Sequence, residues 1–310
     1  MGTILEIKDV SVSFGSGSGA GAVEHFSMDL QEHTRTVLIG ETGSGKSVLL
    51  LSILQLLPKE AQVSGQVLFR GEKLLDKTEK ELEQLRGNEI SYIPQGSGNG
   101  MNPLLKVGFQ VGEPMMEHCG KSKKEAIAES VALLRRFHIG REAERVKAYP
   151  HTFSGGMRQR AMVAMGISAG ATLLLADEPT KGLDYNRIDM VANCFETLEN
   201  VTLLCVTHDI TFAQRVAQQV SVMYAAQQLE EASRDAFFSN PLHPYSQAIL
   251  DAMPERGLKS RVGFAPSHAA YEQTGCRFAS RCPYRTEKCR QMPPMFLKDG
   301  HKVRCWLYEP

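Results

Sequence analysis

The order of apolar and polar residues predicts an alternation of strands and helices. Apolar and polar residues alternate along ILEIKDVSVSF, residues 4–14, as in a strand with one buried face. Helices are predicted over 47–57, before Pro58, and over 121–137. Three further runs are almost continuously apolar, as in strands buried on both faces: TRTVLIG (34–40), ATLLLADEP (171–179) and NVTLLCVTHD (200–209). This alternation indicates an α/β fold with a mostly parallel sheet.

The composition and periodicity of the chain change near its C-terminal end. SGQVLFRGEKL, residues 64–74, still predicts a pair of strands. After about residue 240, Pro and Cys become more frequent, aliphatic residues thin out and long periodic segments stop. We therefore expect one domain over 1–240 and a small loop-rich extension over 241–310.

Composition and charge exclude some classes of protein. Of the 310 residues, 42% are hydrophobic and 23% charged, which is ordinary for a globular protein. Lys+Arg and Asp+Glu both number 35, so no bulk positive charge indicates a nucleic-acid partner. The longest apolar run, residues 48–58, is shorter than the roughly 20 residues that span a bilayer. The N-terminus lacks the basic start and apolar core of a signal peptide, so we expect a soluble cytoplasmic protein.

A glycine-rich turn between a predicted strand and a predicted helix indicates phosphate binding. GETGSGKS, residues 40–47, fits G-x-x-x-x-G-K-[ST]. In this turn backbone amides surround phosphate oxygens, and the helix start adds the positive end of its dipole. Lys46 is expected to contact the β- and γ-phosphates, and Ser47 to ligate Mg²⁺. The expected nucleotide-binding residues are Gly40, Thr42, Gly43, Ser44, Gly45, Lys46, Ser47 and Val48. The chain is thus predicted to be a P-loop NTPase.

An acidic pair ends the apolar run of TLLLADEPT, residues 172–180. A strand here would carry Asp177 to the carboxyl edge of the sheet beside the P-loop, where it is expected to hold Mg²⁺ through water. Glu178, one residue further on, is expected to polarise the water that attacks the γ-phosphate.

A second anion-binding turn narrows the class of NTPase. In FSGGMRQR, residues 153–160, Ser154 and the amides of Gly155 and Gly156 would form a cradle at a helix start. This stretch resembles the signature loop of ABC-transporter ATPases, whose commonest form is L-S-G-G-Q. The resemblance implies that the cradle faces the γ-phosphate of ATP held by a partner subunit.

Other motifs of that family occur along the chain in the family's order. Gln95 in SYIPQ matches the Q-loop glutamine, which the resemblance implies to sense Mg²⁺. Asp184 in KGLD matches the D-loop at the dimer interface, and His208 in VTHD matches the histidine on the γ-phosphate. Phe14 matches the aromatic residue that stacks on adenine. The implied fold is an ABC nucleotide-binding domain, with a RecA-like core, an antiparallel β subdomain and a helical subdomain near 90–168.

Further stretches resemble one branch of the family, the oligopeptide/dipeptide/nickel importer ATPases. AYPHTFSGGMRQR (148–160) carries the branch's YPH before the signature, and NPLHPYSQAIL (240–250) resembles its P-x-HPYT segment. The branch then adds a C-terminal region of the form G-C-x-F-x-x-R-C followed by two more cysteines. The matching residues are Gly275, Cys276, Phe278, Arg281, Cys282, Cys289 and Cys305.

The C-terminal cysteines are candidate metal ligands. Clustered cysteines in a cytoplasmic chain indicate a metal site rather than disulfides. Their spacing, C-x5-C-x6-C-x15-C, is unlike the C-x2-C pairs of zinc ribbons. The resemblance implies that Cys276, Cys282, Cys289 and Cys305 hold a [4Fe–4S] cluster, as in the D-type subunit; zinc is the alternative. Cys119, Cys194 and Cys205 are expected to be packing residues.

The resemblance implies an ATPase that energises import of peptides or nickel chelates from the cytoplasmic face of the membrane. The implied partners are a related ATPase subunit, two membrane permeases that dock on the segment after Gln95, and, indirectly, an extracytoplasmic binding protein. The alternatives are an ATPase of another ABC transporter, including an exporter, or a non-transport ABC ATPase acting on ribosomes or DNA. An exporter would not account for HPYS and the cysteine region. The non-transport class usually carries tandem cassettes or long coiled-coil insertions, whereas this chain has one cassette, no heptads and no basic patch.

Three departures from the family pattern bear on the structure. Phe153 replaces the usual Leu of the signature, an apolar exchange expected to be harmless. Lys181 stands where a small or polar residue is common. MYAAQQLEEAS, residues 223–233, lacks the glycines of the family's hairpin, which puts a tight turn there in doubt.

Overall fold

The computed structural model describes residues 2–15, 21–96, 100–259, 271 and 274–310. The chain forms two compact units. The first unit comprises Met1–Gln31, Arg35–Leu75 and Val206–Pro310, and the second comprises Glu32–Thr34 and Asp76–Cys205. Within the described ranges, no helix has the length and apolar character needed to cross a membrane. The domain limits predicted at residue 240 and at 90–168 stay predictions.

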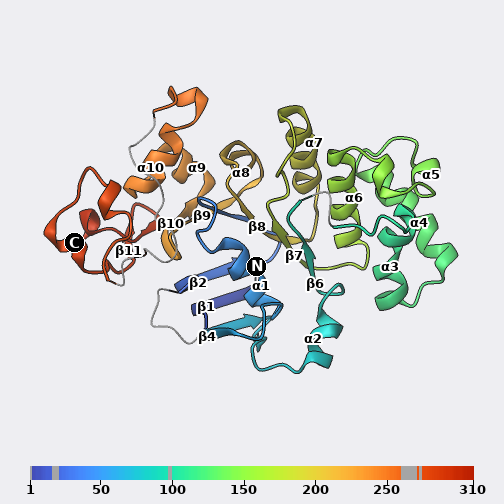
Figure 1. The fold of residues 1–310 in the computed structure, drawn as a ribbon, viewed down its shortest axis with the longest axis horizontal. Helices are drawn as coiled ribbons and strands as arrows, with labels where there is room; N and C mark the ends of the chain where they lie inside the picture. The colour runs from blue at the N-terminus through green and yellow to red at the C-terminus, as the bar shows by residue number, and fades with distance from the viewer. Residues whose placement is uncertain (1, 16–20, 97–99, 260–270, 272–273) are drawn as a thin grey trace. The chain divides into compact units, whose positions relative to one another are not determined.

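The first unit contains a sheet with the strand order β5-β4-β1-β2-β10-β9-β3 (Figure 1). Pairs β1–β2, β1–β4, β4–β5 and β9–β10 are antiparallel, whereas β3–β9 is parallel. The predicted strand over 4–14 and the predicted strand pair over 64–74 are therefore confirmed. The strands are β1 (Thr3–Phe14), β2 (Val23–Gln31), β3 (Arg35–Ile39), β4 (Ala61–Phe69), β5 (Glu72–Lys73), β9 (Gln219–Tyr224) and β10 (Gln227–Ser233).

Helix α1 (Lys46–Ile53) ends earlier than its apolar run predicts. Gln55 adopts a left-handed conformation, with φ 52°. The amide of Gln55 donates to the carbonyl of Ser52, and the amide of Leu56 donates to that of Leu51. This pattern is a Schellman motif, which satisfies the last carbonyls of a helix and ends it before Pro58 is reached. The unit's other α-helices are α8 (Ile210–Val216), α9 (Arg234–Ser239) and α10 (Pro244–Asp251), and the 3₁₀ turn Pro254–Arg256 follows α10.

The hairpin between β9 and β10 forms without glycine. Its two turn residues, Ala225 and Ala226, have φ angles of 47° and 69°. Such a two-residue turn normally takes Asn-Gly, because a Cβ is strained at positive φ. The carbonyl of Ala226 accepts from the amide of Glu24, and its amide donates to the carbonyl of Ser44. Contacts with neighbouring segments thus hold a turn that the local sequence disfavours.

The second unit contains a parallel strand pair and a group of helices. Strands β6 (Ile90–Ile93) and β7 (Leu173–Asp177) pair in parallel, with Ile90 opposite Leu173. Strand β8 (Thr202–Thr207) neighbours β7, and its first four residues belong to this unit. The helices are α2 (Glu79–Leu85), α3 (Val107–Cys119), α4 (Lys123–Arg136), α5 (Glu142–Arg145), the 3₁₀ turn Pro150–Thr152, α6 (Gly155–Ile167) and α7 (Tyr185–Glu196).

Local signals in the sequence account for the helices of the second unit. Helix α4 begins with a capping box of Ser122 and Glu125, which confirms the helix predicted over 121–137. It packs on α3 through the Ser130 hydroxyl, which donates to the Gly108 carbonyl at 3.0 Å.

Cys194 and Cys205 are buried, as expected for packing residues. The same expectation was wrong for Cys119, the last residue of α3, which is exposed.

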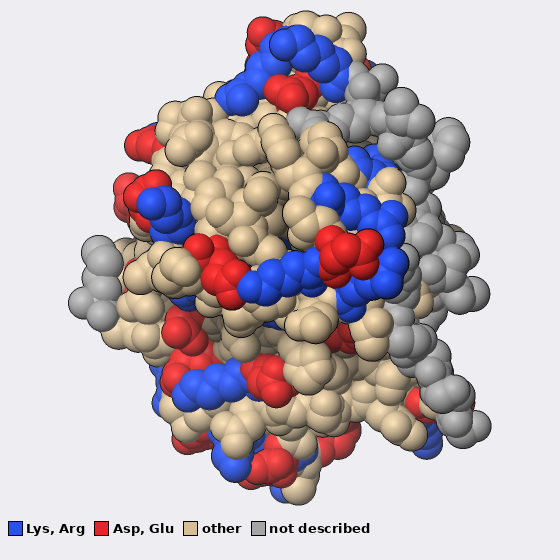
Figure 2. Space-filling view, turned by 90° about the vertical axis from the view of Figure 1, so that its left-hand side faces the viewer, with Lys and Arg blue, Asp and Glu red and all other residues tan. Residues whose placement is uncertain are grey.

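Within the first unit, the C-terminal residues join the sheet through a strand pair. Strands β11 (Phe296–Lys298) and β12 (His301–Val303) form a hairpin, and β12 pairs antiparallel with β10. Between them and α10 lie short 3₁₀ segments: Ala279–Arg281 and Glu287–Arg290, with Trp306–Tyr308 after β12. Figure 2 views this end of the molecule, where acidic and basic side chains lie beside one another. Exposed pairs such as Lys302–Glu231 contribute little stability in water.

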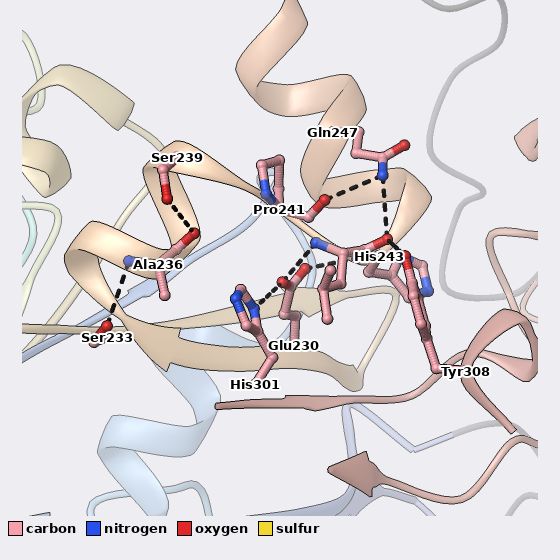
Figure 3. Close-up of polar contacts among 10 residues, drawn as sticks. Glu230, Ser233, Ala236, Ser239, Pro241, His243, Gln247, His301 and Tyr308 are labelled. Atoms are coloured by element: carbon pink, nitrogen blue, oxygen red, sulfur yellow. Dashed lines mark hydrogen bonds and ion pairs between the residues drawn. The ribbon is translucent and has the colours of Figure 1, made fainter. Parts of the chain in front are cut away.

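A fully buried carboxylate joins the C-terminal hairpin to the loop before α10 (Figure 3). Glu230 on β10 accepts from His301 Nδ1 of β12 at 2.7 Å. It also accepts from the amides of Leu242 and His243, at 2.8 and 2.9 Å. The Tyr308 hydroxyl donates to the Leu242 carbonyl at 2.7 Å. Burial acts to raise the pKa of Glu230, but the hydrogen bonds that the carboxylate itself accepts lower it below the usual value for a glutamate.

We predict that Glu230→Gln lowers the free energy of unfolding by about 1–3 kcal/mol, because the new amide group leaves a buried donor unpaired. Since the folded-state pKa of Glu230 is lowered, the loss is complete above the ordinary glutamate pKa and shrinks as the pH falls through the folded-state value. Urea denaturation from pH 7 down to pH 3 measures it. Glu231→Gln, which alters the surface pair with Lys302 and the hydrogen bond from Gln228 Nε2 at 3.2 Å, is the matched control. Equal losses in both variants would contradict the prediction.

Candidate functional site

The glycine-rich turn lies where the sequence places it, between β3 and α1. Its backbone passes very close to neighbouring segments. A Cβ at Gly40 would lie 2.1 Å from the carbonyl oxygen of Met223, and one at Gly45 would lie 2.1 Å from that of Ala22. Gly45 also has φ 101°. Because no side chain fits at either position, glycine is required there by contact as well as by conformation.

Lys46 is held inside the turn. Its side chain is 5% exposed, and Nζ donates to the carbonyls of Gly40 and Glu41 at 2.8 and 2.9 Å. Ser44 is buried and Ser47 and Val48 are half-buried, whereas Thr42 and Gly43 are exposed. The ammonium group thus lies beside backbone that faces solvent, at the first residue of a helix. Such a turn can bind a phosphate group.

His208 and Phe14 also belong to the first unit. His208, directly after β8, is exposed and lines a cavity of about 500 Å³ together with Glu41 of the turn. Phe14 is the last residue of β1 and is 45% exposed, so it is not a core residue. Its ring is accessible for stacking, as the predicted adenine contact requires.

The second unit carries Gln95, Asp177 and Glu178 at the carboxyl ends of its paired strands. Asp177 is the buried last residue of β7, and its Oδ2 accepts from the Tyr92 hydroxyl at 3.2 Å. Burial, followed by the charge of Asp177, raises the pKa of Tyr92. Gln95 is exposed, just beyond β6. The sequence analysis missed Tyr92, although parallel pairing of SYIPQ with LLLAD would have placed it near Asp177.

Glu178 has an unusual backbone. It is 5% exposed and has φ 46°, a conformation that costs energy for a residue with a side chain. The amide of Lys181 donates to its carbonyl at 3.1 Å, which closes a turn directly after β7. Strain of this kind is concentrated at functional sites, and here it sets the direction of a carboxylate.

Two helix starts of the second unit carry the remaining predicted residues. Ser154 is the N-cap of α6, and its hydroxyl accepts from the amide of Met157 at 3.3 Å. Gly155 and Gly156 open that helix, with Gly156 close to Arg187 of α7. Asp184 caps α7 and forms an ion pair with Arg187 at 3.0 Å. Lys181 is exposed, so its charge is available on the surface.

The four C-terminal cysteines line one cavity of about 110 Å³ in the first unit. Burial raises the pKa of Cys276 to about 12 and that of Cys305 to about 11, so both are neutral thiols at pH 7. Among the residues that the structure describes, no three His, Cys, Asp or Glu side chains are arranged to hold a metal ion. The predicted ligands therefore share a cavity without forming a coordination shell.

His243 also lines this cavity. Its Nδ1 accepts from the amide of Tyr245 at 3.0 Å, and burial lowers its pKa to about 4. The ring is therefore neutral and carries its proton on Nε2. In the described part of the chain, this buried Nε2 has no hydrogen-bond partner. The cavity thus combines four thiols with a neutral N–H donor.

Comparison with known families gives two matches along the chain. Residues 23–181 match the model described as ABC transporter. Residues 229–289 match the model described as Oligopeptide/dipeptide transporter, C-terminal region.

Several curated proteins are similar over nearly the whole chain. The dipeptide transport ATP-binding protein DppD of Bacillus subtilis is 36% identical, covering 100% of this chain and 96% of its own. DppD of Escherichia coli is 37% identical, covering 97% and 96%. The oligopeptide transport ATP-binding protein OppD of Bacillus subtilis is 36% identical, covering 99% and 89%.

Solved structures share the fold. The dimeric post-hydrolysis state of the ATP-binding cassette MJ0796 bound to ADP and Pi has a TM-score of 0.66 and 23% identity, covering 74% of this chain and 99% of that one. The structure of cbiO1 from Clostridium perfringens, part of a cbiONQ complex, has a TM-score of 0.62 and 21% identity, covering 82% and 97%. These similarities confirm the predicted P-loop fold.

Proposed function

This chain belongs to the ABC transporter family, and we propose that it is the ATP-binding and ATP-hydrolysing subunit of an importer of peptides. The observation that carries the proposal is the phosphate-binding turn, with the Lys46 ammonium held inside it at the start of α1. The match of residues 229–289 to the C-terminal region of oligopeptide/dipeptide transporters favours import of peptides over export. The names of the relatives favour peptides over nickel chelates.

Each predicted site residue has a role in this proposal. Lys46 and the amides of the turn would hold the phosphates of ATP, and Ser47, Gln95 and Asp177 would hold Mg²⁺ directly or through water. Glu178 would accept a proton from the attacking water, and His208 would contact the γ-phosphate. Phe14 would stack on adenine. The amides at the start of α6, with Ser154, would bind the γ-phosphate of ATP on a paralogous partner subunit, and Asp184 would lie at that interface.

A groove in the second unit suits a membrane permease. Leu104 is 81% exposed, and it lines a cavity of about 520 Å³ with Leu105, Phe109 and Tyr149. Lys106, Lys123 and Lys147 rim this apolar surface. The groove includes Leu104, Leu105 and Phe109 of the segment that follows Gln95, and the family resemblance implies that this segment docks on the permeases. A short amphipathic helix of a permease would bury its apolar face here, which would place the subunit at the cytoplasmic side of the membrane.

We propose that the cysteine cavity binds a [4Fe–4S] cluster, with zinc as the alternative. Four cysteines are the usual ligand set for such a cluster. The unpartnered N–H of His243 fits as well, because a thiolate or sulfide sulfur would accept its hydrogen bond. When bound, the cluster would cross-link a region that is rich in loops. His243 would then orient a sulfur, while the cysteines supply the bonds.

We predict that Glu178→Gln abolishes ATP turnover, because the amide cannot accept the proton of the attacking water, while ATP binding persists. ATPase rates of the complex in lipid, assembled with its permeases, partner ATPase and binding protein, measure this. With the unaltered chain, peptides should stimulate turnover and nickel chelates should not. Stimulation by nickel chelates alone would replace the peptide assignment, and normal turnover of Glu178→Gln would refute the role of the glutamate.

We predict that Leu104→Glu prevents docking, because a charge would be buried against an apolar permease surface. The measurement is co-purification of the two permeases with the tagged ATPase subunit. Leu297→Glu is the matched control, since Leu297 is also 81% exposed but lies on β11. Retention of the permeases by the Leu104 variant would show that they dock elsewhere.

We predict that the chain purified without oxygen carries about four iron atoms and inorganic sulfide. Cys305→Ser should lose most of this iron, whereas Cys119→Ser, which alters an exposed cysteine outside the cavity, should keep it. Metal and sulfide analysis with visible absorption distinguishes the cases. Zinc without sulfide would establish the alternative, and a metal-free chain would exclude both.

A further inference from the structure

Glu41, at a position that the G-x-x-x-x-G-K-[ST] pattern leaves open, is held by residues from the C-terminal part of the chain. Arg281 Nη1 donates to its two carboxylate oxygens, at 3.1 and 3.4 Å. The amide of Glu41 donates to the Tyr245 hydroxyl at 3.1 Å. The carbonyl of the same residue accepts from Lys46, so Glu41 connects the C-terminal residues to the phosphate-binding lysine.

Arg281 is itself fixed in place. Its guanidinium lies over the rings of Tyr224 and Phe278, at 5.7 and 5.5 Å from their centroids. It also donates to the Tyr224 hydroxyl at 3.3 Å. The side chain is only 13% exposed, so the ion pair with Glu41 is partly shielded from water. Because Arg281 is restrained, its ion pair restricts the position of the Glu41 carboxylate more than a pair between two mobile side chains would.

A second connection reaches the turn through the glycine-free hairpin. Arg277, whose side chain is 1% exposed, donates to the carbonyl of Ala225 and pairs with Glu24 at 2.7 Å. The amide of Ala226, which follows Ala225 in the hairpin, donates a hydrogen bond to the carbonyl of Ser44. This contact explains how two alanines keep a left-handed turn, since Arg277 and Ser44 hold it from both sides.

Both arginines belong to the segment that carries the cysteines. Arg277 follows Cys276, and Arg281 precedes Cys282. The amide of Cys276 donates to the carbonyl of Cys289, which ties this part of the segment together. Any change in the backbone of residues 276–282 therefore moves the groups that contact the phosphate-binding turn.

We propose that Arg281 is a positioning residue for ATP binding: through Glu41 it fixes the shape of the phosphate-binding turn, and so makes that shape depend on the cysteine segment. The proposal rests on the proposed function, because it requires that the turn bind ATP. Arg281 acts through Glu41 and touches no reacting atom. Its loss should weaken ATP binding without changing the chemical step.

The test is titration of the purified full chain with mant-ATP and Mg²⁺. Arg281→Met should weaken binding by roughly tenfold, the scale expected for a partly buried charged hydrogen bond. Arg281→Lys should recover part of this affinity, since an ammonium can still reach one carboxylate oxygen. Arg290→Met is the matched control, because Arg290 lies in the same region but pairs only with exposed Glu287 among the ion pairs seen here. In the assembled complex, Arg281→Met should raise KM for ATP and leave kcat within about twofold.

A double-mutant cycle separates positioning from a general loosening of the fold. Glu41→Gln should weaken binding as much as Arg281→Met, and the double variant should lose no more than either. Additive losses, or an Arg281→Met variant that binds like Arg290→Met, would overturn the proposal. Lys46→Ala should abolish binding whether or not Arg281 matters. Normal binding by Lys46→Ala would instead refute the proposed function.

Discussion

The structure of the first unit depends on how closely its segments approach the phosphate-binding turn. The carbonyls of Met223 and Ala22 come so near to Gly40 and Gly45 that no side chain fits. The turn also accepts a hydrogen bond from Ala226, at the tip of the β9–β10 hairpin. Two segments distant in sequence, around Ala22 and in the β9–β10 hairpin, therefore enclose a loop whose amides must stay available for phosphate. Its shape is set by these neighbours as much as by its own glycines.

The parts that could be predicted from the sequence are those governed by local rules. The P-loop pattern and the cap at Ser154 each require only residues within a few positions of one another. The buried strands β7 and β8 follow from uninterrupted apolar runs. The residues of the phosphate-binding turn were predicted in this way, whereas Gln95, Asp184, His208 and Phe14 were assigned by resemblance, and their roles stay predictions.

The parts that could not be predicted depend on partners far away in the chain. Arg281 and Glu41 are 240 positions apart, and no periodicity connects them. The hairpin turn was in doubt because Ala225 and Ala226 are poor turn residues, yet Arg277 and Ser44 hold it. The early end of α1 likewise follows from helix-end geometry, which apolar periodicity does not encode.

The buried polar contacts of the C-terminal region act as links rather than as sources of net stability. A buried ion pair gains little over well-packed apolar residues, but it accepts only one geometry. Glu230 fixes β12 and the loop before α10 relative to β10, while Arg277 and Arg281 fix the cysteine segment relative to the hairpin and Glu41. An apolar interface would tolerate sliding between these elements. Directional contacts do not, and this is why a region rich in loops can set the shape of a phosphate-binding turn.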